Sequence, residues 1–233
     1  MRLRAIVEGG PPACACRWRR YTRLLDYGET RSDPLAVKAV QDEVDALEKA
    51  GAWDWENVCA REEVERWARD NSVTVHIGLG LGICSIKYSE LPRDKWVRKG
   101  RLCYRAPTAR DESGALAIYQ EMSSRPTTVV AMNVSIAWGA VKGHKTSVAD
   151  AVKAYVQADL NSVNPTYIEI PSYLCGSRWR NIKRPVSRLL KALYGHPEAG
   201  AHWERHLAQI IRSMGGQVLP AHPSCFFPQI GSY

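Results

Sequence analysis

Asp150 is the residue of this sequence with the clearest potential for metal chemistry. It lies where a run typical of a strand, 145–149, changes into a run compatible with a helix, 151–160. Side chains at the carboxyl ends of strands in an open sheet face the crevice where ligands bind, so Asp150 is a candidate metal-binding acid. Asp is also a favoured N-cap residue, and on spacing alone a capping role for Asp150 is the alternative interpretation.

Two further patterns have the residue types of a binding site. Glu198, His202 and His206 follow one another at four-residue spacing, which would place them on one helix face as metal ligands. Without the His-Glu-x-x-His order, surface histidines are the preferred interpretation. The Gly78-x-Gly80-x-Gly82 run lacks the spacing of a dinucleotide fingerprint and no helix follows it, so it predicts a strand bent by glycines.

Basic residues form two groups that could bind phosphates. Along 99–105, an extended chain would point four side chains to one face, where they could hold a triphosphate or a template backbone: Lys99, Arg101, Cys103 and Arg105. The alternative is an edge strand protected by its charges. The second group, within 178–184, interleaves aromatic residues and could bind phosphates and stack on bases; its cations are Arg178, Arg180, Lys183 and Arg184.

The charge distribution favours a polyanionic partner at the C-terminal side. The net charge is +8, and after Leu160 eight Lys or Arg residues face only three acids. Such polarity suits nucleic acid, although an ordinary solvated surface produces similar patterns. Seven scattered cysteines without a Cys-x-x-Cys pair predict reduced thiols in an intracellular protein. No apolar run is long enough for a membrane span, and the N-terminus does not resemble a secretory signal.

The elements that must position these residues follow from periodicity and from helix start and stop signals. An arm poor in regular structure is expected over 1–32, followed by a globular part over 33–233. Helices are predicted over 34–50, where Asp33 and Pro34 begin the helix and Gly51 ends it, over 61–71 with Val64 and Trp67 inward, over 127–141 as a buried helix, and over 197–214, with a short one near 115–122. Strands are predicted over 73–87, 99–105 and 166–170.

Several of these segments together resemble the reverse transcriptase domain of copia-type LTR retrotransposons. The family pattern Asp-Val-Lys-x-Ala-Phe-Leu-x-Gly-x-Leu is similar to Asp150–Leu160 without a gap, and Leu-Tyr-Gly-Leu-Lys-Gln-Ala-Pro-Arg-x-Trp is similar to Leu193–Trp203. Lys99–Cys103 resembles the Lys-Ala-Arg-Leu-Val strand, and Ser224–Phe226 the Asp-Pro-Cys-x-Phe strand with its acid lost. The resemblance covers about residues 36–229, with departures at Ala151, Val152, His196 and Glu198.

The resemblance implies an α+β fold that is part of a right-hand polymerase, with fingers and palm. The N-terminal arm over 1–32 is expected to be disordered from its composition. The resemblance also implies that Asp150 is the first of the palm carboxylates that hold two Mg²⁺ ions, with the Ala151 carbonyl beside it. The expected nucleotide-binding residues are an aromatic gate that selects deoxynucleotides, the two cations and their neighbours: Tyr155, Lys99, Arg101, Ala151, Ala154, Tyr194 and Gly195. The implied partners are an RNA template with a DNA primer, and deoxynucleoside triphosphates.

One departure from the family bears on activity. The family places a Tyr-x-Asp-Asp hairpin shortly after the Cys-x-Phe strand, whereas this sequence ends at Tyr233 and contains no Asp-Asp pair. One carboxylate holds two Mg²⁺ ions poorly, so we expect the chain as given to polymerise poorly or not at all, unless a downstream polypeptide supplies the remaining palm and an RNase H domain. The alternatives are a non-catalytic nucleic-acid-binding remnant of a retroelement and a degenerate fragment without a selected role.

Overall fold

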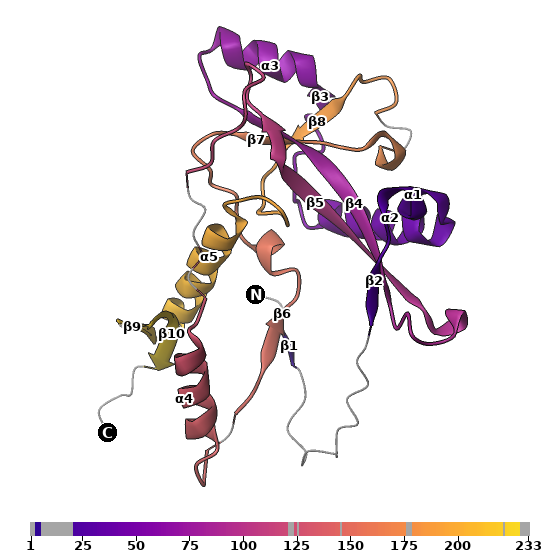
Figure 1. The fold of residues 1–233 in the computed structure, drawn as a ribbon. Helices are drawn as coiled ribbons and strands as arrows, with labels where there is room; N and C mark the ends of the chain where they lie inside the picture. Colours follow the sequence, from indigo (N-terminus) through magenta and orange to yellow (C-terminus); the bar gives the residue numbers. More distant parts are fainter. Residues whose placement is uncertain are drawn as a thin grey trace.

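The computed structural model describes residues 3–5, 21–120, 124, 126–144, 146–175, 179–220 and 222–228, and these form a mixed α+β structure (Figure 1). Its α-helices are α1 (Tyr27–Ser32), α2 (Pro34–Lys49), α3 (Arg61–Asp70), α4 (Val129–Gly139) and α5 (Ala199–Ser213). Its strands are β1 (Leu3–Ala5), β2 (Thr22–Leu24), β3 (Cys59–Ala60), β4 (His76–Lys87), β5 (Val97–Arg110), β6 (Ala149–Ala151), β7 (Thr166–Glu169), β8 (Pro185–Arg188), β9 (Gly216–Leu219) and β10 (His222–Pro228). Three 3₁₀ helices complete it: η1 (Arg93–Lys95), η2 (Ala154–Gln157) and η3 (Ser172–Leu174).

Strand β4 is the centre of the main sheet. On one edge it pairs antiparallel with β5 over nearly its whole length. On the other edge it pairs with β7 in parallel near its start and with β2 antiparallel near its end, and β8 and β3 continue the sheet beyond β7. The long β4 and β5 arrows cross the middle of Figure 1, with β7 and β8 above them.

The predicted alternation along β5 is confirmed. Gly100, Leu102 and Tyr104 are buried, whereas Lys99 and Arg105 on the opposite face are exposed. The glycine run of β4 is a strand, as predicted, and two of its glycines are required by packing. A Cβ at Gly78 would lie 2.3 Å from the Tyr104 ring, so a larger residue would displace that buried side chain.

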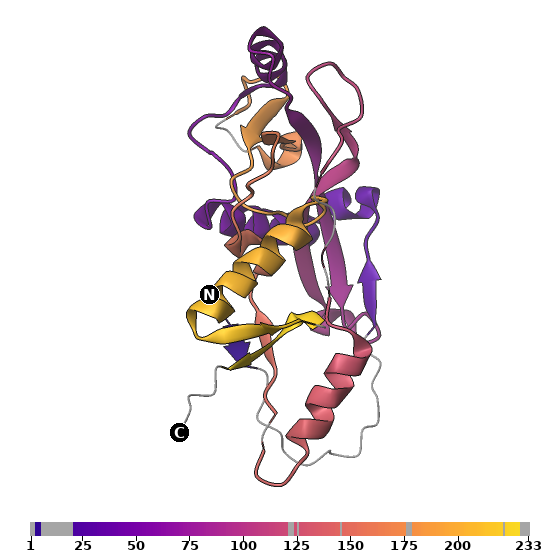
Figure 2. The same cartoon turned by 90° about the vertical axis from the view of Figure 1, so that its left-hand side faces the viewer.

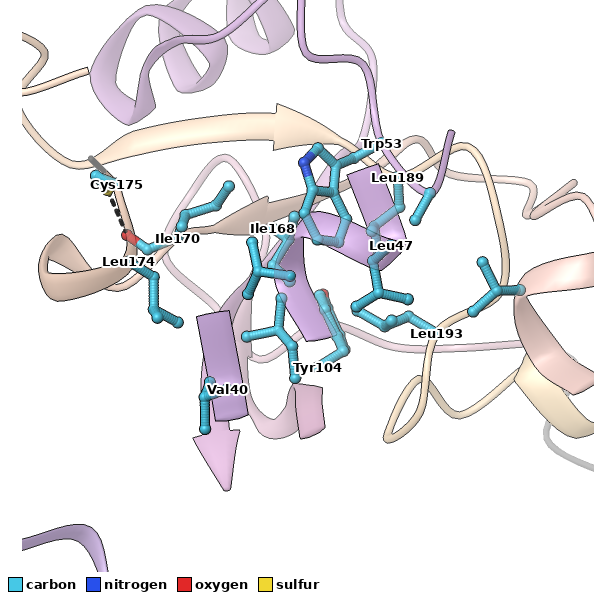
Figure 3. Packing of buried hydrophobic residues seen from close by; sticks show 14 of the residues in the cluster. Val40, Leu47, Trp53, Tyr104, Ile168, Ile170, Leu174, Cys175, Leu189 and Leu193 are labelled. Carbon is cyan, nitrogen blue, oxygen red and sulfur yellow. Dashed lines mark hydrogen bonds between the residues drawn. The ribbon is translucent and has the colours of Figure 1, made fainter. Parts of the chain in front are cut away.

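Helix α2 forms the main core against β4 and β5. The Asp33 carboxylate accepts a hydrogen bond from the Leu35 N–H, Pro34 occupies the first turn, and Gly51 follows the helix with φ +66°, all as the start and stop signals predict. The buried face of the helix packs with aromatic and aliphatic side chains of β5, β7 and η3, as Figure 3 shows; this face consists of Ala36, Val40, Val44 and Leu47. In the same view the Cys175 thiol donates to the Ile170 carbonyl at 3.5 Å.

Helix α3 packs on a second, smaller core formed with β4 and β8. Val64 and Ala68 of the helix contact the cluster that contains Ile77 and Val186. The helix and Val64 lie as predicted, but the inward placement of Trp67 is wrong, because 47% of its surface is exposed. Val64 and Ala68 already cover the narrow core, and Trp67 lies beside their face.

Helix α4 corrects the expectation of a buried helix. It is apolar along most of its length, yet six of its large side chains are half or more exposed: Val129, Val130, Met132, Val134, Ile136 and Trp138. Figure 2 shows α4 at the end of the molecule away from the main sheet, near α5 and the β9–β10 hairpin. Ala131 is its buried residue. High apolarity indicated burial, but no described element covers this helix on most sides.

The N-terminal region differs from the expected unstructured arm in its described parts. Strand β1 pairs with β6, strand β2 pairs with β4, and helix α1 begins with a complete capping box between Asp26 and Glu29. The short helix expected near 115–122 is not helical over 115–120, where the chain forms a loop after β5. Among the described residues, no helix has both the length and the apolarity required to cross a membrane.

Candidate functional site

Asp150 lies in the short strand β6, and its carboxylate is exposed. The strand pairs antiparallel with β1, which places Asp150 opposite Arg4 in the register. The expected helix after Asp150 is the 3₁₀ helix η2, whose N-cap is Lys153 with φ +53°, so Asp150 does not cap a helix. The capping alternative for Asp150 is therefore wrong. The strand ends where the chain turns through a left-handed residue at Lys153.

Two predicted nucleotide-binding side chains from separate segments, Arg101 and Tyr155, each contact a third, Tyr194. The Arg101 guanidinium of β5 lies over the Tyr194 ring, 5.0 Å from its centroid. The Tyr155 ring of η2 meets the same Tyr194 ring edge-on, with a centroid distance of 5.0 Å. We call these residues, together with Lys99 and Asp150, the Arg101 cluster.

The charges of the Arg101 cluster influence one another. Partial burial lowers the pKa of the Lys99 ammonium, and the positive charges of Arg101 and Lys87 lower it further. The carboxylates of Glu43 and Asp150 act in the opposite direction. Three cations and two carboxylates therefore share one region of the surface. A bound polyanion would relieve the repulsion among the cations, as a triphosphate or a nucleic-acid backbone does.

The structure explains why position 195 is a glycine, which the sequence resemblance does not. Its φ is +85°, and a Cβ there would lie 2.2 Å from the Tyr104 carbonyl oxygen. The Tyr104 N–H donates to the Tyr194 carbonyl at 2.7 Å, which fixes the 194–195 turn along the free edge of β5. This turn holds the Tyr194 ring beside Arg101. Ala151 and Ala154 are half-buried on either side of the Lys153 turn.

The second basic group is largely paired with acids. Lys183 forms an exposed ion pair with Glu62 at 2.8 Å, and Arg184 donates two hydrogen bonds to Glu169, at 3.1 and 2.9 Å. Arg180 is exposed, and Arg178 lies outside the described residues. Among the three predicted nucleic-acid-binding cations that the structure describes, Arg180 is thus the one that forms no ion pair with another described residue.

A metal site of the expected kind does not fit the described residues. None of them form a group of three or more His, Cys, Asp or Glu side chains able to hold an ion. The Glu198, His202 and His206 spacing does not create one either. The single carboxylate of Asp150, with Lys99 nearby, cannot offset the charge of two Mg²⁺ ions. Magnesium binding at Asp150 is therefore a proposal, and it requires further carboxylates from outside the residues that the structure describes.

Sequence reasoning missed a buried polar cluster beside the core. His76, His196, Glu198 and His202 are each 5% exposed or less, so the surface interpretation of His202 is wrong. Glu198 is the hub: its carboxylate accepts hydrogen bonds from the Gln120 N–H at 3.1 Å and from the Ser162 hydroxyl, and lies 3.6 Å from His202 Nε2. It ties α5 to the loops at 120 and 162.

Tyrosine rings pack against two of the three histidines of this cluster, His76 and His196. The Tyr119 ring packs edge-on against both His76 and His196, with centroid distances of 4.6 and 5.1 Å. Burial lowers the pKa of His196 to about 4 and also lowers that of His76, although the Glu198 carboxylate opposes both shifts. Both imidazoles are therefore neutral at pH 7. Tyr104 and Tyr119 hydroxyls share a 2.8 Å hydrogen bond, and burial raises the pKa of Tyr119 to about 12.

The signal for this cluster was present in the sequence but ambiguous. His196 and Glu198 are two of the positions where the chain departs from the retrotransposon signature. Their burial and their partners at 119–120 and 162 depend on tertiary packing, which helical spacing does not reveal.

No protein-family model matches this chain, no curated protein is significantly similar to it, and no solved structure matches its fold. Its function is therefore inferred from its own motifs and geometry.

Proposed function

We propose that this chain is a fragment of a retrotransposon reverse transcriptase that binds a deoxynucleoside triphosphate and a template–primer at the Arg101 cluster. The observation that carries the proposal is the convergence of Arg101, Tyr194 and Tyr155, which come from three motifs far apart in the sequence. Lys99 supplies a second cation to the same surface. Cations and aromatic rings on one face suit phosphates and bases together.

The roles within the cluster follow from side-chain chemistry. Lys99 and Arg101 neutralise the triphosphate, and Arg101 is held in position by the Tyr194 ring. Tyr155 lies beside Tyr194 and limits the space around the sugar. Asp150 is the one family carboxylate in this sequence, so the chain as given is expected to bind substrates but to extend a primer poorly.

Binding and extension are tested separately. A fluorescent oligo(dT) primer annealed to poly(rA) is titrated with protein, and extension with thymidine triphosphate and Mg²⁺ is followed in parallel. We expect Lys99→Ala with Arg101→Ala to weaken duplex binding about tenfold, because two phosphate contacts are lost. The matched control removes two cations elsewhere, Lys49→Ala with Arg66→Ala, and should leave binding unchanged.

The role of Asp150 has its own outcome. If the chain extends the primer, Asp150→Asn should abolish that extension while duplex binding persists. Equal extension by both proteins would reject the proposed role of Asp150. Equal duplex binding by the Lys99/Arg101 variant and its matched control would reject the proposed binding surface.

A second candidate function, a nucleic-acid-binding remnant without catalysis, is favoured because Asp150 is the one family carboxylate in this sequence. It predicts binding that weakens steeply with salt, as phosphate contacts require, and no extension with added Mg²⁺. The affinity is measured between about 50 and 200 mM salt, a range over which binding through phosphate contacts weakens strongly. An affinity that does not change over this range would contradict this second candidate function.

A further inference from the structure

A cavity of about 800 Å³ lies along β4, and its lining includes no residue of the Arg101 cluster. Its floor is Leu79–Gly82, and its wall is formed by residues of 170–175 and 179–185, in the chain that follows β7. The cavity lies over Leu79–Gly82 of β4 and includes Arg105 of β5 in its lining, whereas Tyr194 follows the free edge of β5. Its volume is within the range of small-ligand sites, about 300–1,000 Å³.

The edge of β4 is unpaired at this cavity. Strand β7 pairs with His76–Leu79 and β2 pairs with Ser85–Lys87, and no described strand covers the residues between them on this edge. The chain after β7 enters Pro171, which has no N–H with which to continue the ladder. Figure 1 shows β7 leaving β4 above the point where β2 joins it.

Glycine backbone groups face this gap. The Cys84 carbonyl, which accepts from the Leu25 N–H at 2.9 Å, points to this edge, and alternate residues of a strand direct their N–H and C=O groups to the same edge. The Gly80 carbonyl and both backbone groups of Gly82 therefore point toward the cavity. Buried backbone groups require partners, so this edge is suited to hydrogen bonding with a ligand.

A tyrosine hydroxyl without a partner reaches the same place. The Tyr173 hydroxyl is buried and has no hydrogen-bond partner among the described residues. A Cβ at Gly82 would lie 2.3 Å from this oxygen, so the hydroxyl lies directly against the glycine backbone. The Arg31 guanidinium lies over the Tyr173 and Tyr27 rings, 5.4 Å from each centroid. Aromatic surface and a buried polar group thus meet at one cavity wall.

The charge of the cavity is positive. Arg105, Arg180 and Arg184 line it against a single acid, Glu169, which is paired with Arg184. Arg105 and Arg180 are exposed and form no ion pair with any described residue. Two guanidiniums are therefore available to an anion at the mouth of the cavity, where they can hold a phosphate through two parallel hydrogen bonds.

We propose that this cavity binds the base and phosphate of a nucleotide. A planar base stacks on the aromatic wall, and its donors and acceptors match the Gly80 carbonyl and the Gly82 backbone groups, which offer both kinds of partner. The phosphate is held by Arg105 and Arg180. Two ligands present this base and phosphate: a free nucleotide, and one nucleotide of a single-stranded nucleic acid. The site does not depend on the function proposed for the Arg101 cluster.

The test is isothermal titration calorimetry in EDTA, with adenosine monophosphate, adenosine and a single-stranded oligo(dA) pentamer as probes. Adenosine monophosphate should bind more tightly than adenosine. Arg105→Ala with Arg180→Ala should weaken monophosphate binding at least about tenfold, because two charge-assisted contacts are lost. Both side chains are exposed, so the fold is retained, which an unchanged melting temperature verifies.

The controls separate this site from the Arg101 cluster. Lys49→Ala with Arg66→Ala removes the same charge elsewhere, and Lys99→Ala alters the other surface; both should bind adenosine monophosphate as the wild type does. Tyr173→Phe, which removes the buried hydroxyl, should alter affinity for the base without altering the preference for phosphate. Tighter binding of the pentamer identifies a single strand as the source, and tighter binding of the monophosphate identifies a free nucleotide. An unchanged affinity in the Arg105/Arg180 variant, or equal binding of adenosine, overturns the proposal.

Discussion

Acid should destabilise this protein through His196 before its carboxylates are protonated. Burial holds the pKa of His196 at about 4 in the folded chain, against 6.5 when it is exposed on unfolding. Between these values the unfolded chain binds more protons than the folded chain. Stability is therefore complete above pH 6.5 and is lost as the pH falls toward 4.

The size of the effect follows from the same two values. Proton linkage over a pKa difference from 6.5 to about 4 gives a loss of about 2 kcal/mol between pH 7.5 and pH 5.0 for this residue alone. His76, whose pKa burial also lowers, adds to it. The groups that face His196 are Glu198, which opposes the shift, and His76 and His202, whose positive charges would strengthen it.

The assay is urea unfolding at pH 7.5 and pH 5.0 for the wild type, His196→Gln and the matched control His206→Gln. Glutamine preserves a polar group near Thr166, whose hydroxyl lies 3.4 Å from His196 Nε2, but does not titrate. We expect His196→Gln to be less stable at pH 7.5 and to lose about 2 kcal/mol less than the wild type on acidification. A pH dependence equal in all three proteins would refute the burial of a neutral His196.

The remaining predictions concern the positions where packing decides the outcome. Gly195→Ala should lower the free energy of unfolding by about 1–3 kcal/mol or more, because a Cβ at φ +85° meets the Tyr104 carbonyl at 2.2 Å; a denaturation curve like that of the wild type would contradict this contact. Leu47→Ala should cost about 2–5 kcal/mol, since Leu47 is fully buried, whereas Ile136→Ala on exposed α4 should cost about 0.5 kcal/mol or less; similar losses at both positions would show that α4 is covered. Lys183→Ala should change stability by no more than about 1 kcal/mol, because its ion pair with Glu62 is exposed, and a larger loss in urea unfolding would argue against that geometry.

Elements fixed by local chemistry could be predicted from the sequence. The helix that begins at Pro34 was predicted because Asp33 caps it and Gly51 ends it, and both signals act within one turn. The alternation of Lys99, Leu102 and Tyr104 likewise depends only on the two-residue period of a strand.

Features that depend on distant packing could not be predicted. The apolar pattern of α4 indicates burial, yet it does not say whether another element covers the helix, and Ile136 is 55% exposed. Asp150 was expected before a regular helix, but its strand pairs with β1 from the N-terminus. His202 looked like a surface residue because its partner Glu198 is held by loops that are distant in the sequence.

The candidate site likewise combines residues that could be predicted from the sequence with contacts that could not. Motif spacing indicated Arg101, Tyr155 and Tyr194 as separate candidates, and the structure brings their side chains together. Arg184 and Lys183 were grouped by charge, but their acidic partners Glu169 and Glu62 come from other elements. The availability of a cation for phosphate is thus a tertiary property, since it depends on which carboxylates lie nearby.

The most direct measurement of the central claim is a map of backbone amide chemical shifts in the ¹⁵N-labelled protein as thymidine triphosphate and Mg²⁺ are added. Binding at the Arg101 cluster predicts saturating shifts at Lys99, Arg101, Tyr155 and Gly195. Shifts confined to residues outside the Arg101 cluster, or no saturating shifts at all, would contradict the claim that this surface binds a nucleotide.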